Sequence, residues 1–393
     1  GNNEYNDGFS YDNWGGYNLL VKFNQQNPAV RKYLLDVVKY WVSEFDVDGI
    51  RLDAADVLDF GFMHELRMLA NEIKPEFWLM GEVIHGDYSR WVNSDMLHSV
   101  TNYQLYKALY SGHNEHNYFE IAHTVRYLLD KGNLPYYLYN FVDNHDVERI
   151  YTRLLNKHEF VPVHILMYTL PGIPSVYYGS EFGIEGRKEK HSDAVLRPAI
   201  NLEDYPNALD ENGCTNIIAR LGEIRQKNSV FSDGTYQELR LTNRQYAFSR
   251  TNEITQVIVV VNNDEVDLSL DIPATGTYTE LLSGEIQSVD GNLHVHLHAC
   301  SGQIWMKDYD ETVTRKREVK IPEIKQVALK EETIKQVTVD YSKSYEEMSI
   351  EELQACVIEK LAKNGPVTEQ MKRDVANNVY HDSLINWVKS FRN

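Results

Sequence analysis

Three short stretches of this chain place acidic side chains directly after apolar runs. They are Val47-Asp48-Gly49-Ile50-Arg51-Leu52-Asp53, Leu79-Met80-Gly81-Glu82-Val83 and Phe141-Val142-Asp143-Asn144-His145-Asp146. Buried parallel strands read as apolar runs, and they present functional side chains at their carboxyl ends. Three acids at three such ends, namely Asp53, Glu82 and Asp146, therefore predict one active site.

Carboxyl groups gathered in this way suit the cleavage of a glycosidic bond. Cleavage with retention needs a carboxylate nucleophile and a carboxylic acid roughly 5 Å apart, around an oxocarbenium-like transition state. A further acid can bind sugar hydroxyls as charge develops on the ring. Arg51 precedes Asp53 by two residues, so on a strand both side chains leave by the same face. We expect Arg51 to keep Asp53 ionised, as a nucleophile must be.

At these residues the chain resembles the α-amylase family of retaining α-glucosidic enzymes. Residues 49–54 resemble the family's fourth-strand motif, residues 81–83 its fifth-strand motif, residues 141–146 its seventh-strand Asn-His-Asp motif and residues 171–181 its eighth strand. The resemblance implies that Asp53 is the nucleophile, Glu82 the general acid/base and Asp146 the stabiliser of the transition state. It also implies polar support from Arg51 and His145.

Other residues near these motifs are candidates for contacting substrate. Asn144 belongs to the Asn-His-Asp triplet, and His85 and Asp87 follow Glu82 closely. Aromatic rings that could stack on sugars are Trp14, Tyr17, Tyr88, Trp91, Tyr177 and Tyr178. Each assignment has a structural alternative, because most Tyr and Trp residues simply pack in cores, and an isolated Arg-x-Asp is often a surface ion pair.

The expected fold class is α/β, with an incomplete TIM (β/α)8 barrel over residues 1–227. Helices are expected at residues 27–44 and 60–74, and the sixth, seventh and eighth strands of the resembled barrel at residues 97–103, 136–142 and 175–178. Together with the Asp53 and Glu82 strands this makes strands 4–8, whereas a closed barrel needs eight. Unpaired apolar edges then predict self-association or pairing with a missing N-terminal portion.

Two further domains are expected. Residues 228–307 contain alternating runs at 236–241, 246–250, 256–262, 266–272, 278–282 and 293–298, which predict an antiparallel β-sandwich. Within it His294, His296 and His298 share one face, and we interpret them as a polar strand face rather than a metal site.

The last part, residues 308–393, predicts a linker followed by a small helical module. Residues 312–345 are charged and punctuated by Val and Ile. A capping box at residues 349–352 opens a helix to about residue 363, and further helical patterns cover residues 368–379 and 382–391. Their apolar stripes indicate a packing or oligomerisation surface.

Composition restricts the partners. The 393 residues carry a formal net charge of −19, which argues against nucleic acid and anionic membranes and is compatible with a neutral carbohydrate. Three cysteines without framework spacing favour a reducing, cytoplasmic compartment. No cofactor is expected, because the calcium ligands of the resembled family lie largely in a region that these residues do not encode.

The expected activity is therefore retaining hydrolysis of maltodextrin-like or starch-like α-glucan oligosaccharides. The motif carries Asp56-Val57 where starch-degrading amylases often have a Lys-His pair, and this favours relatives that act on short maltodextrins, cyclodextrins or pullulan. Two alternatives remain open: transglycosylation or isomerisation through the same intermediate, and a non-catalytic chain that binds carbohydrate or protein.

Overall fold

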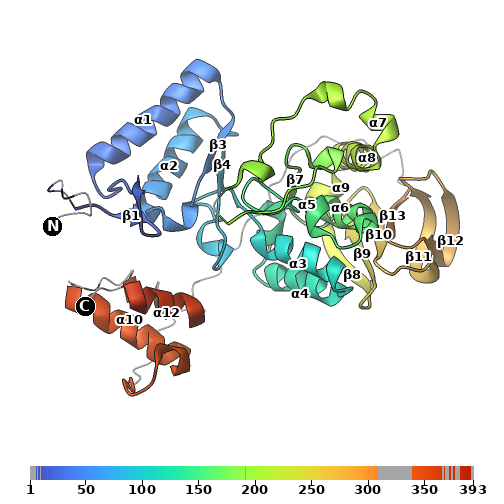
Figure 1. Ribbon diagram of the computed structural model, residues 1–393. Coiled ribbons are helices and arrows are strands. Elements are labelled where there is room, and N and C mark those ends of the chain that lie inside the picture. The colour runs from blue at the N-terminus through green and yellow to red at the C-terminus, as the bar shows by residue number, and fades with distance from the viewer. Residues whose placement is uncertain are drawn as a thin grey trace. The chain divides into compact units, whose positions relative to one another are not determined.

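The computed structural model describes residues 6, 8, 10–190, 192–308, 339–364, 367, 371–372, 375–376 and 381–390 (Figure 1). The chain divides into two units, Gly1–Lys325 and Gln326–Asn393, each with its own internal contacts. Among the described residues, none of the helices combines the length and the low polarity that crossing a bilayer requires.

The first unit starts with a hairpin and continues as alternating strands and helices. Its elements are β1 (Asn13–Trp14), β2 (Tyr17–Val21), α1 (Pro28–Phe45), β3 (Gly49–Leu52), α2 (Phe60–Ile73), β4 (Trp78–Gly81), β5 (Ser99–Val100), α3 (Tyr103–Asn114), α4 (Tyr118–Leu129), β6 (Tyr139–Phe141), α5 (Ile150–Arg153), α6 (Phe160–Thr169), β7 (Ile173–Ser175), α7 (Ala208–Glu211), α8 (Gly213–Lys227) and α9 (Val230–Asp233). This alternation produces parallel strands with helical crossovers.

The five strands β3 to β7 run parallel in sequence order. β3 pairs with β4 and β4 with β5, while Thr101 forms a parallel bridge to Tyr139, and β6 pairs with β7. Among the described residues, β3 and β7 have no second strand neighbour. All five carboxyl ends therefore reach one rim of the sheet, where the predicted acids lie.

Local signals in the sequence set the helix boundaries. Asn27 accepts a hydrogen bond from the backbone of Ala29, Pro28 fills the first turn of α1, and Asp46 ends the helix in the left-handed region with φ 50°. Asp59 caps α2 by accepting from the backbone of Phe62. Both helices confirm the predicted ranges within a residue or two.

Three predicted strands are shorter in the structure than the sequence suggested. The predicted sixth strand is reduced to β5 because Asn102 caps α3, which starts at the next residue. The seventh begins late, at Tyr139, because residues Leu134–Tyr137 form a 3₁₀ turn. The eighth, predicted at residues 175–178, lies two residues earlier as β7 and shares only Ser175 with the prediction. In the first two cases side-chain capping or a turn replaces ladder pairing at the strand end.

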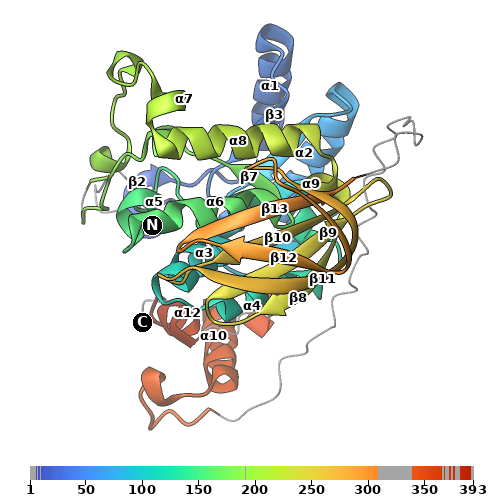
Figure 2. The same ribbon diagram turned by 90° about the vertical axis from the view of Figure 1, so that its right-hand side faces the viewer.

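The C-terminal part of the first unit is an all-β antiparallel domain. Its strands are β8 (Thr235–Leu241), β9 (Gln245–Thr251), β10 (Gln256–Asn262), β11 (Leu268–Glu280), β12 (Ile286–Leu297) and β13 (Ser301–Lys307). They form one hydrogen-bonded sheet in the order β12-β11-β13-β10-β9-β8, seen from its broad side in Figure 2. The six strands are thus joined in a single sheet rather than in two separate sheets.

The strand boundaries in this domain correct the prediction in two ways. β11 joins two predicted runs across Pro273 and Gly276, because both residues are paired with β12 along a continuous register. β13 was missed, although all of its residues except Lys307 pair with β10. Long-range pairing overrides the local turn signals here.

The sheet is held by buried apolar residues on both of its faces. One cluster joins strands β9 to β13 and includes Ile258, Leu270, Val295 and Trp305. A second cluster packs strands β9, β10 and β13 against α6 and α8. The all-β domain therefore shares a core with the helices that follow the parallel strands.

The second unit is helical where it is described. α10 spans Ile350–Asn364 and α12 spans His381–Ser390. Ser349 and Glu352 exchange the two hydrogen bonds of the predicted capping box, at 2.8 and 3.2 Å. Leu353, Val357 and Leu384 are buried between the helices. Most of the predicted linker and of the predicted helix at residues 368–379 lies outside the described residues.

Candidate active site

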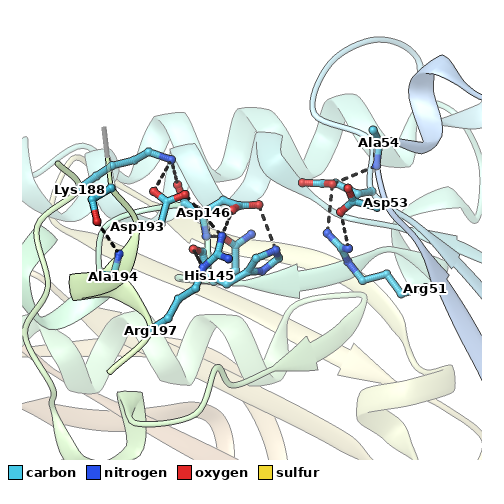
Figure 3. A network of polar contacts seen from close by, with 12 residues as sticks. Arg51, Asp53, Ala54, His145, Asp146, Lys188, Asp193, Ala194 and Arg197 are labelled. Carbon is cyan, nitrogen blue, oxygen red and sulfur yellow. Dashed lines mark hydrogen bonds and ion pairs between the residues drawn. The ribbon is translucent and has the colours of Figure 1, made fainter. Parts of the chain in front are cut away.

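Asp53 and Glu82 lie side by side because they follow neighbouring strands in matching register. Leu52 of β3 pairs with Gly81 of β4, and each acid is the next residue. One guanidinium holds both: Arg51 Nη1 lies 2.7 Å from Asp53 Oδ1, and Arg51 Nη2 lies 3.1 Å from Glu82 Oε2 (Figure 3). The expected Arg51–Asp53 pair is confirmed, and Arg51 also reaches the second acid.

Gly81 allows this close approach of the two strand ends. A Cβ atom at this position would lie 2.4 Å from Leu97 Cδ1 and 2.8 Å from Ala55 Cβ, well inside van der Waals contact. Glycine is therefore required at the residue before Glu82, and any side chain there would push β4 away from its neighbours.

The environments of the two carboxylates differ. The side chain of Asp53 is 79% exposed, whereas that of Glu82 is 10% exposed. The hydrogen bond from Arg51, which outweighs the opposing effect of burial, holds the pKa of Asp53 below its usual value. Asp53 is thus an ionised, accessible carboxylate, and Glu82 is an enclosed one.

A strained turn at Ala54 places a backbone hydrogen-bond donor next to the Glu82 carboxylate. Ala54 adopts the left-handed region with φ 44°, which is uncommon for a residue with a Cβ atom. This conformation aims the amide of Ala54 at Glu82, so that its nitrogen lies 3.2 Å from Oε2. Strained backbone of this kind persists where the surrounding structure holds it, and it concentrates at functional sites.

Tyr103 is a site residue that the sequence analysis missed. Its hydroxyl lies 3.4 Å from Glu82 Oε1 and accepts a hydrogen bond from Asn144 Nδ2 at 3.1 Å. Burial raises the pKa of Tyr103 to about 12, so the phenol keeps its proton at neutral pH. A signal was available, because Tyr103 lies three residues beyond β5, at the same rim as the acids.

Asp146 is held by a second group of polar side chains. His145 Nε2 lies 3.1 Å from Asp146 Oδ2, and Arg197 Nη2 lies 2.8 Å from Asp146 Oδ1 (Figure 3). Asn144 Oδ1 accepts from the Asp146 backbone at 2.8 Å. Arg197 comes from the segment after β7 and belongs to none of the recognised motifs, so no signal in the sequence pointed to it.

The two groups face each other across the site. Figure 3 shows Arg51 and Asp53 on one side and His145 and Asp146 on the other. Although burial opposes the effect, the hydrogen bond that Arg51 donates to Asp53 and the charges of Glu82, Asp53 and Asp146 raise the pKa of Arg51. All three predicted acids therefore stabilise the charge of the same guanidinium, that of Arg51.

His85 lies at the margin of this group. It is exposed, and it lies close enough to affect the pKa of Asp56. Burial raises the pKa of Asp56, with a further contribution from Glu82, and His85 lowers it. Asp87 has a structural role instead, because it caps a 3₁₀ turn and binds Lys131 Nζ at 2.8 Å.

The aromatic candidates divide into two classes. Tyr88 and Trp91 are buried in the core that surrounds the parallel strands, so the prediction that they stack on sugar is wrong. Trp14 and Tyr17 are exposed and stack on each other, with ring centroids 5.9 Å apart. The ring of Tyr177 lies 6.4 Å from that of His145 and packs edge-on against Tyr178, which is partly exposed.

Asp143, which precedes these residues in the motif, is a buried structural acid. Its oxygens accept from the backbone of Ile150 at 2.7 Å and from the hydroxyl of Ser180 at 2.7 Å. Burial, which outweighs these hydrogen bonds, raises its pKa from 3.8 to about 6. The side chain positions the loop that carries Asp146.

We expect Asp143→Asn to reduce the pH dependence of stability. Because the folded pKa lies above the unfolded one, the folded state holds a proton between pH values of roughly 4 and 6, and stability falls as pH rises through that window. The contribution is at most about 3 kcal/mol. Denaturant unfolding at several pH values should show that the free energy of unfolding of the variant, relative to that of the parent, rises from low to neutral pH.

Asp48→Asn is the matched control for this experiment. Asp48 is exposed just before β3 and forms a surface ion pair with Lys74. We expect the free energy of unfolding of this variant, relative to that of the parent, to stay constant over the same pH range. A pH dependence that is unchanged in Asp143→Asn would contradict the assignment.

Comparison with known proteins agrees with this geometry. Residues 5–220 match the family model described as the alpha amylase catalytic domain, and residues 240–332 match the alpha amylase C-terminal all-beta domain. The fold is similar to that of an α-amylase from Anoxybacillus, with a TM-score of 0.64 and 24% identity over 74% of this chain and 65% of that one. This structural likeness supports the fold.

Two curated relatives are similar in sequence. A cyclomaltodextrinase from Thermoanaerobacter pseudethanolicus is 31% identical over 249 residues, which is 62% of this chain and 42% of the relative. An intracellular maltogenic amylase from Bacillus subtilis is 29% identical over 265 residues, covering 65% of this chain and 44% of the relative. The chain thus spans less than half the length of these relatives.

The catalytic-domain match covers more than half of the chain and includes all three acids at the rim of the parallel strands. The chain belongs to the α-amylase family, with an amylase-like catalytic domain followed by the family's all-β antiparallel domain.

Proposed function

We propose that this chain carries the catalytic carboxyl groups of a retaining hydrolase that acts on α-glucan oligosaccharides. The observation that carries the proposal is the single Arg51 guanidinium that binds Asp53 and Glu82 from adjacent parallel strands. A nucleophile and an acid must flank the same anomeric carbon, and their shared cation keeps both carboxyl groups within one site.

In the proposed mechanism Asp53 attacks the anomeric carbon while Glu82 protonates the departing oxygen. A covalent glycosyl-enzyme forms, and Glu82 then takes a proton from the water that releases the sugar. The lowered pKa and the exposure of Asp53 suit the nucleophile. Glu82, with little exposure and hydrogen bonds from Ala54 and Tyr103, suits a group that moves a proton away from bulk water.

Asp146 and its neighbours are proposed to bind the sugar. An ionised carboxylate opposite the nucleophile stabilises the charge that develops on the ring, provided that it is already oriented. His145 and Arg197 provide that orientation, and Asn144 fixes the backbone of Asp146. We assign His85 to the margin of the binding site, where it is exposed.

We further propose that the five parallel strands are part of a larger (β/α) barrel. Two observations support this: β3 and β7 lack a second strand neighbour in the described chain, and large apolar side chains are exposed on β2, on α1 and between them. The exposed residues are Leu19, Leu20, Val21, Phe23, Tyr33, Tyr40, Trp41 and Phe45. Further (β/α) units, from a longer gene product or from a second chain, would cover these surfaces.

The proposed domains are residues 1–227 for the partial barrel, 228–307 for the β domain and 308–393 for a linker with a helical module. The shift from α8 and α9 to the first strand of the antiparallel sheet supports the first boundary. The end of β13 at Lys307 supports the second.

We place the protein in a reducing, cytoplasmic compartment. Its three cysteines are free thiols, which is usual for proteins of a reducing compartment. The relative from Bacillus subtilis is named as an intracellular enzyme, which supports the same placement.

The test is the anomeric configuration of the first product. The chain alone and the full gene product that contains it are incubated with maltotriose, and the reducing sugar is followed by proton NMR before mutarotation. We expect the α-anomer from the full gene product and slower release from the chain alone. Initial release of the β-anomer would refute retention.

Three other outcomes separate the remaining functions. Absence of any cleavage, combined with binding of maltotriose, would replace the hydrolase by a carbohydrate-binding chain. Longer oligosaccharides among the first products would indicate transfer to a sugar acceptor rather than to water. A rearranged disaccharide would indicate isomerisation.

A further inference from the structure

The outer face of the β11–β12 hairpin carries a ladder of histidine, carboxylate and hydroxyl groups. In the register of these two strands Ser269 lies opposite His296 and Asp271 opposite His294, and His298 lies one position beyond the Leu268–Leu297 pair. The alternate residues of both strands point into the core. The histidines of this face therefore stand in a row above a rigid sheet.

Each histidine has a partner on β11 or just before it. His294 Nδ1 lies 2.9 Å from Asp271 Oδ1, and His296 Nδ1 lies 3.0 Å from Ser269 Oγ. His298 Nδ1 lies 2.9 Å from Asp267 Oδ2. The sequence suggested a plain polar face because no carboxylate could be placed beside the histidines. The strand register places two there, those of Asp267 and Asp271.

Three of these residues converge further. Asp267, His296 and His298 each bring one possible ligand atom to within 4.8 Å of the other two. The rings of His296 and His298 are 5.3 Å apart between centroids and nearly perpendicular. Ligands about 2.0–2.2 Å from a tetrahedral ion lie roughly 3.4 Å apart, so small rotations of exposed side chains suffice to close the site.

We propose that Asp267, His296 and His298 form a binding site for a divalent transition-metal ion of the Zn²⁺ or Cu²⁺ class. Two imidazoles and one carboxylate are a donor set that these ions prefer, whereas Mg²⁺ and Ca²⁺ prefer oxygen alone. Water would complete the coordination, since all three side chains are exposed.

Neighbouring groups orient two of the ligands. The backbone amide of Ala299 donates to Asp267 Oδ1 at 2.9 Å and fixes that carboxylate. The hydroxyl of Ser269 holds Nδ1 of His296 and leaves its Nε2 available. Such outer contacts set the orientation of metal-binding histidines.

The bound ion would connect the beginning of β11 with the end of β12. β12 is a terminal strand of the sheet and has β11 as its main partner, and Figure 1 shows it at the outer side of the domain. A cross-link at the open end of this hairpin stabilises the folded sheet, because the ion binds only when the two strands are paired. The site is independent of the catalytic proposal.

The experiment is a titration of the full chain with Zn²⁺ alone at neutral pH, followed by calorimetry. We expect one tight equivalent per chain and a rise in the melting temperature with added Zn²⁺. His296→Ala, His298→Ala and Asp267→Asn should each weaken binding by about tenfold or more. Circular dichroism without metal checks that each variant folds.

His294→Ala is the matched control. His294 lies on the same strand and face and has its own carboxylate, Asp271, but it stands outside the converging group. We expect its Zn²⁺ affinity to remain within about twofold of the parent. Equal weakening in this variant would overturn the proposed ligand set.

Electron paramagnetic resonance with one equivalent of Cu²⁺ gives a second readout. The parent should show two coordinating imidazole nitrogens, and His296→Ala and His298→Ala should each show one. Absence of a tight Zn²⁺ equivalent, or a tight equivalent that survives all three ligand variants, would overturn the proposal.

Discussion

Asp53→Asn is expected to abolish turnover of α-glucosides, with a loss of about 10⁴-fold or more in kcat. The amide keeps the shape of the side chain but cannot form the glycosyl-enzyme, and it also loses the ion pair with Arg51 at 2.7 Å. The measurement is the initial rate on an activated aryl α-glucoside, made with the gene product that contains this chain. Added azide should restore part of the activity in Asp53→Ala and give a product of inverted configuration.

Asp48→Asn serves as the control for this variant. It changes the same side-chain type at the opposite end of β3, where Asp48 pairs with Lys74 at the surface. Its rate should match that of the parent. If Asp53→Asn kept more than about a tenth of the parental rate, the nucleophile would have to be another residue.

Glu82→Gln is expected to slow maltotriose hydrolysis by about 10²–10⁴-fold. Glutamine cannot supply the proton that the departing sugar oxygen needs. An aryl leaving group needs no such proton, so formation of the glycosyl-enzyme from the activated substrate should be much less affected. Stopped-flow measurement of the first turnover on both substrates separates these steps.

Glu76→Gln tests the specificity of this result. Glu76 is exposed and lies two residues before β4, at the opposite end of the same strand. Both substrates should be turned over at parental rates. An equal loss on the aryl glucoside and on maltotriose in Glu82→Gln would argue for a general structural defect instead of a missing proton donor.

The site could be predicted from the sequence where it rests on strand geometry. An acid that follows an apolar run lies at the carboxyl rim, and residues two apart on a strand share a face. These two rules predict Asp53, Glu82 and Asp146 at one rim, where the structure brings them together around Arg51, and they pair Arg51 with Asp53. The contact of Arg51 with Glu82 depends on the register between strands, which local periodicity does not contain.

The residues that the sequence missed depend on long-range packing. Arg197 reaches Asp146 from 51 positions further along the chain, at the end of a short 3₁₀ helix, Ala194–Leu196. Tyr88 and Trp91 follow Glu82 closely in the sequence, yet both are core residues, because they pack in the buried cluster that contains Leu79 of β4. β11 likewise crosses Pro273 and Gly276, where a partner strand supplies the pairing.

The shared guanidinium of Arg51 has a consequence for how such a catalyst can change over time. Since a single side chain forms ion pairs with both carboxyl groups that we propose to react, we expect its loss or displacement to alter attack and proton delivery together. A substitution that is selected for its effect on nucleophilic attack would therefore also change proton delivery. The two steps could change separately only if a second cation paired with one of the two carboxyl groups. We accordingly expect sequence differences among related proteins in the loops that contact the substrate, whereas Arg51 and its two carboxylate partners should not change.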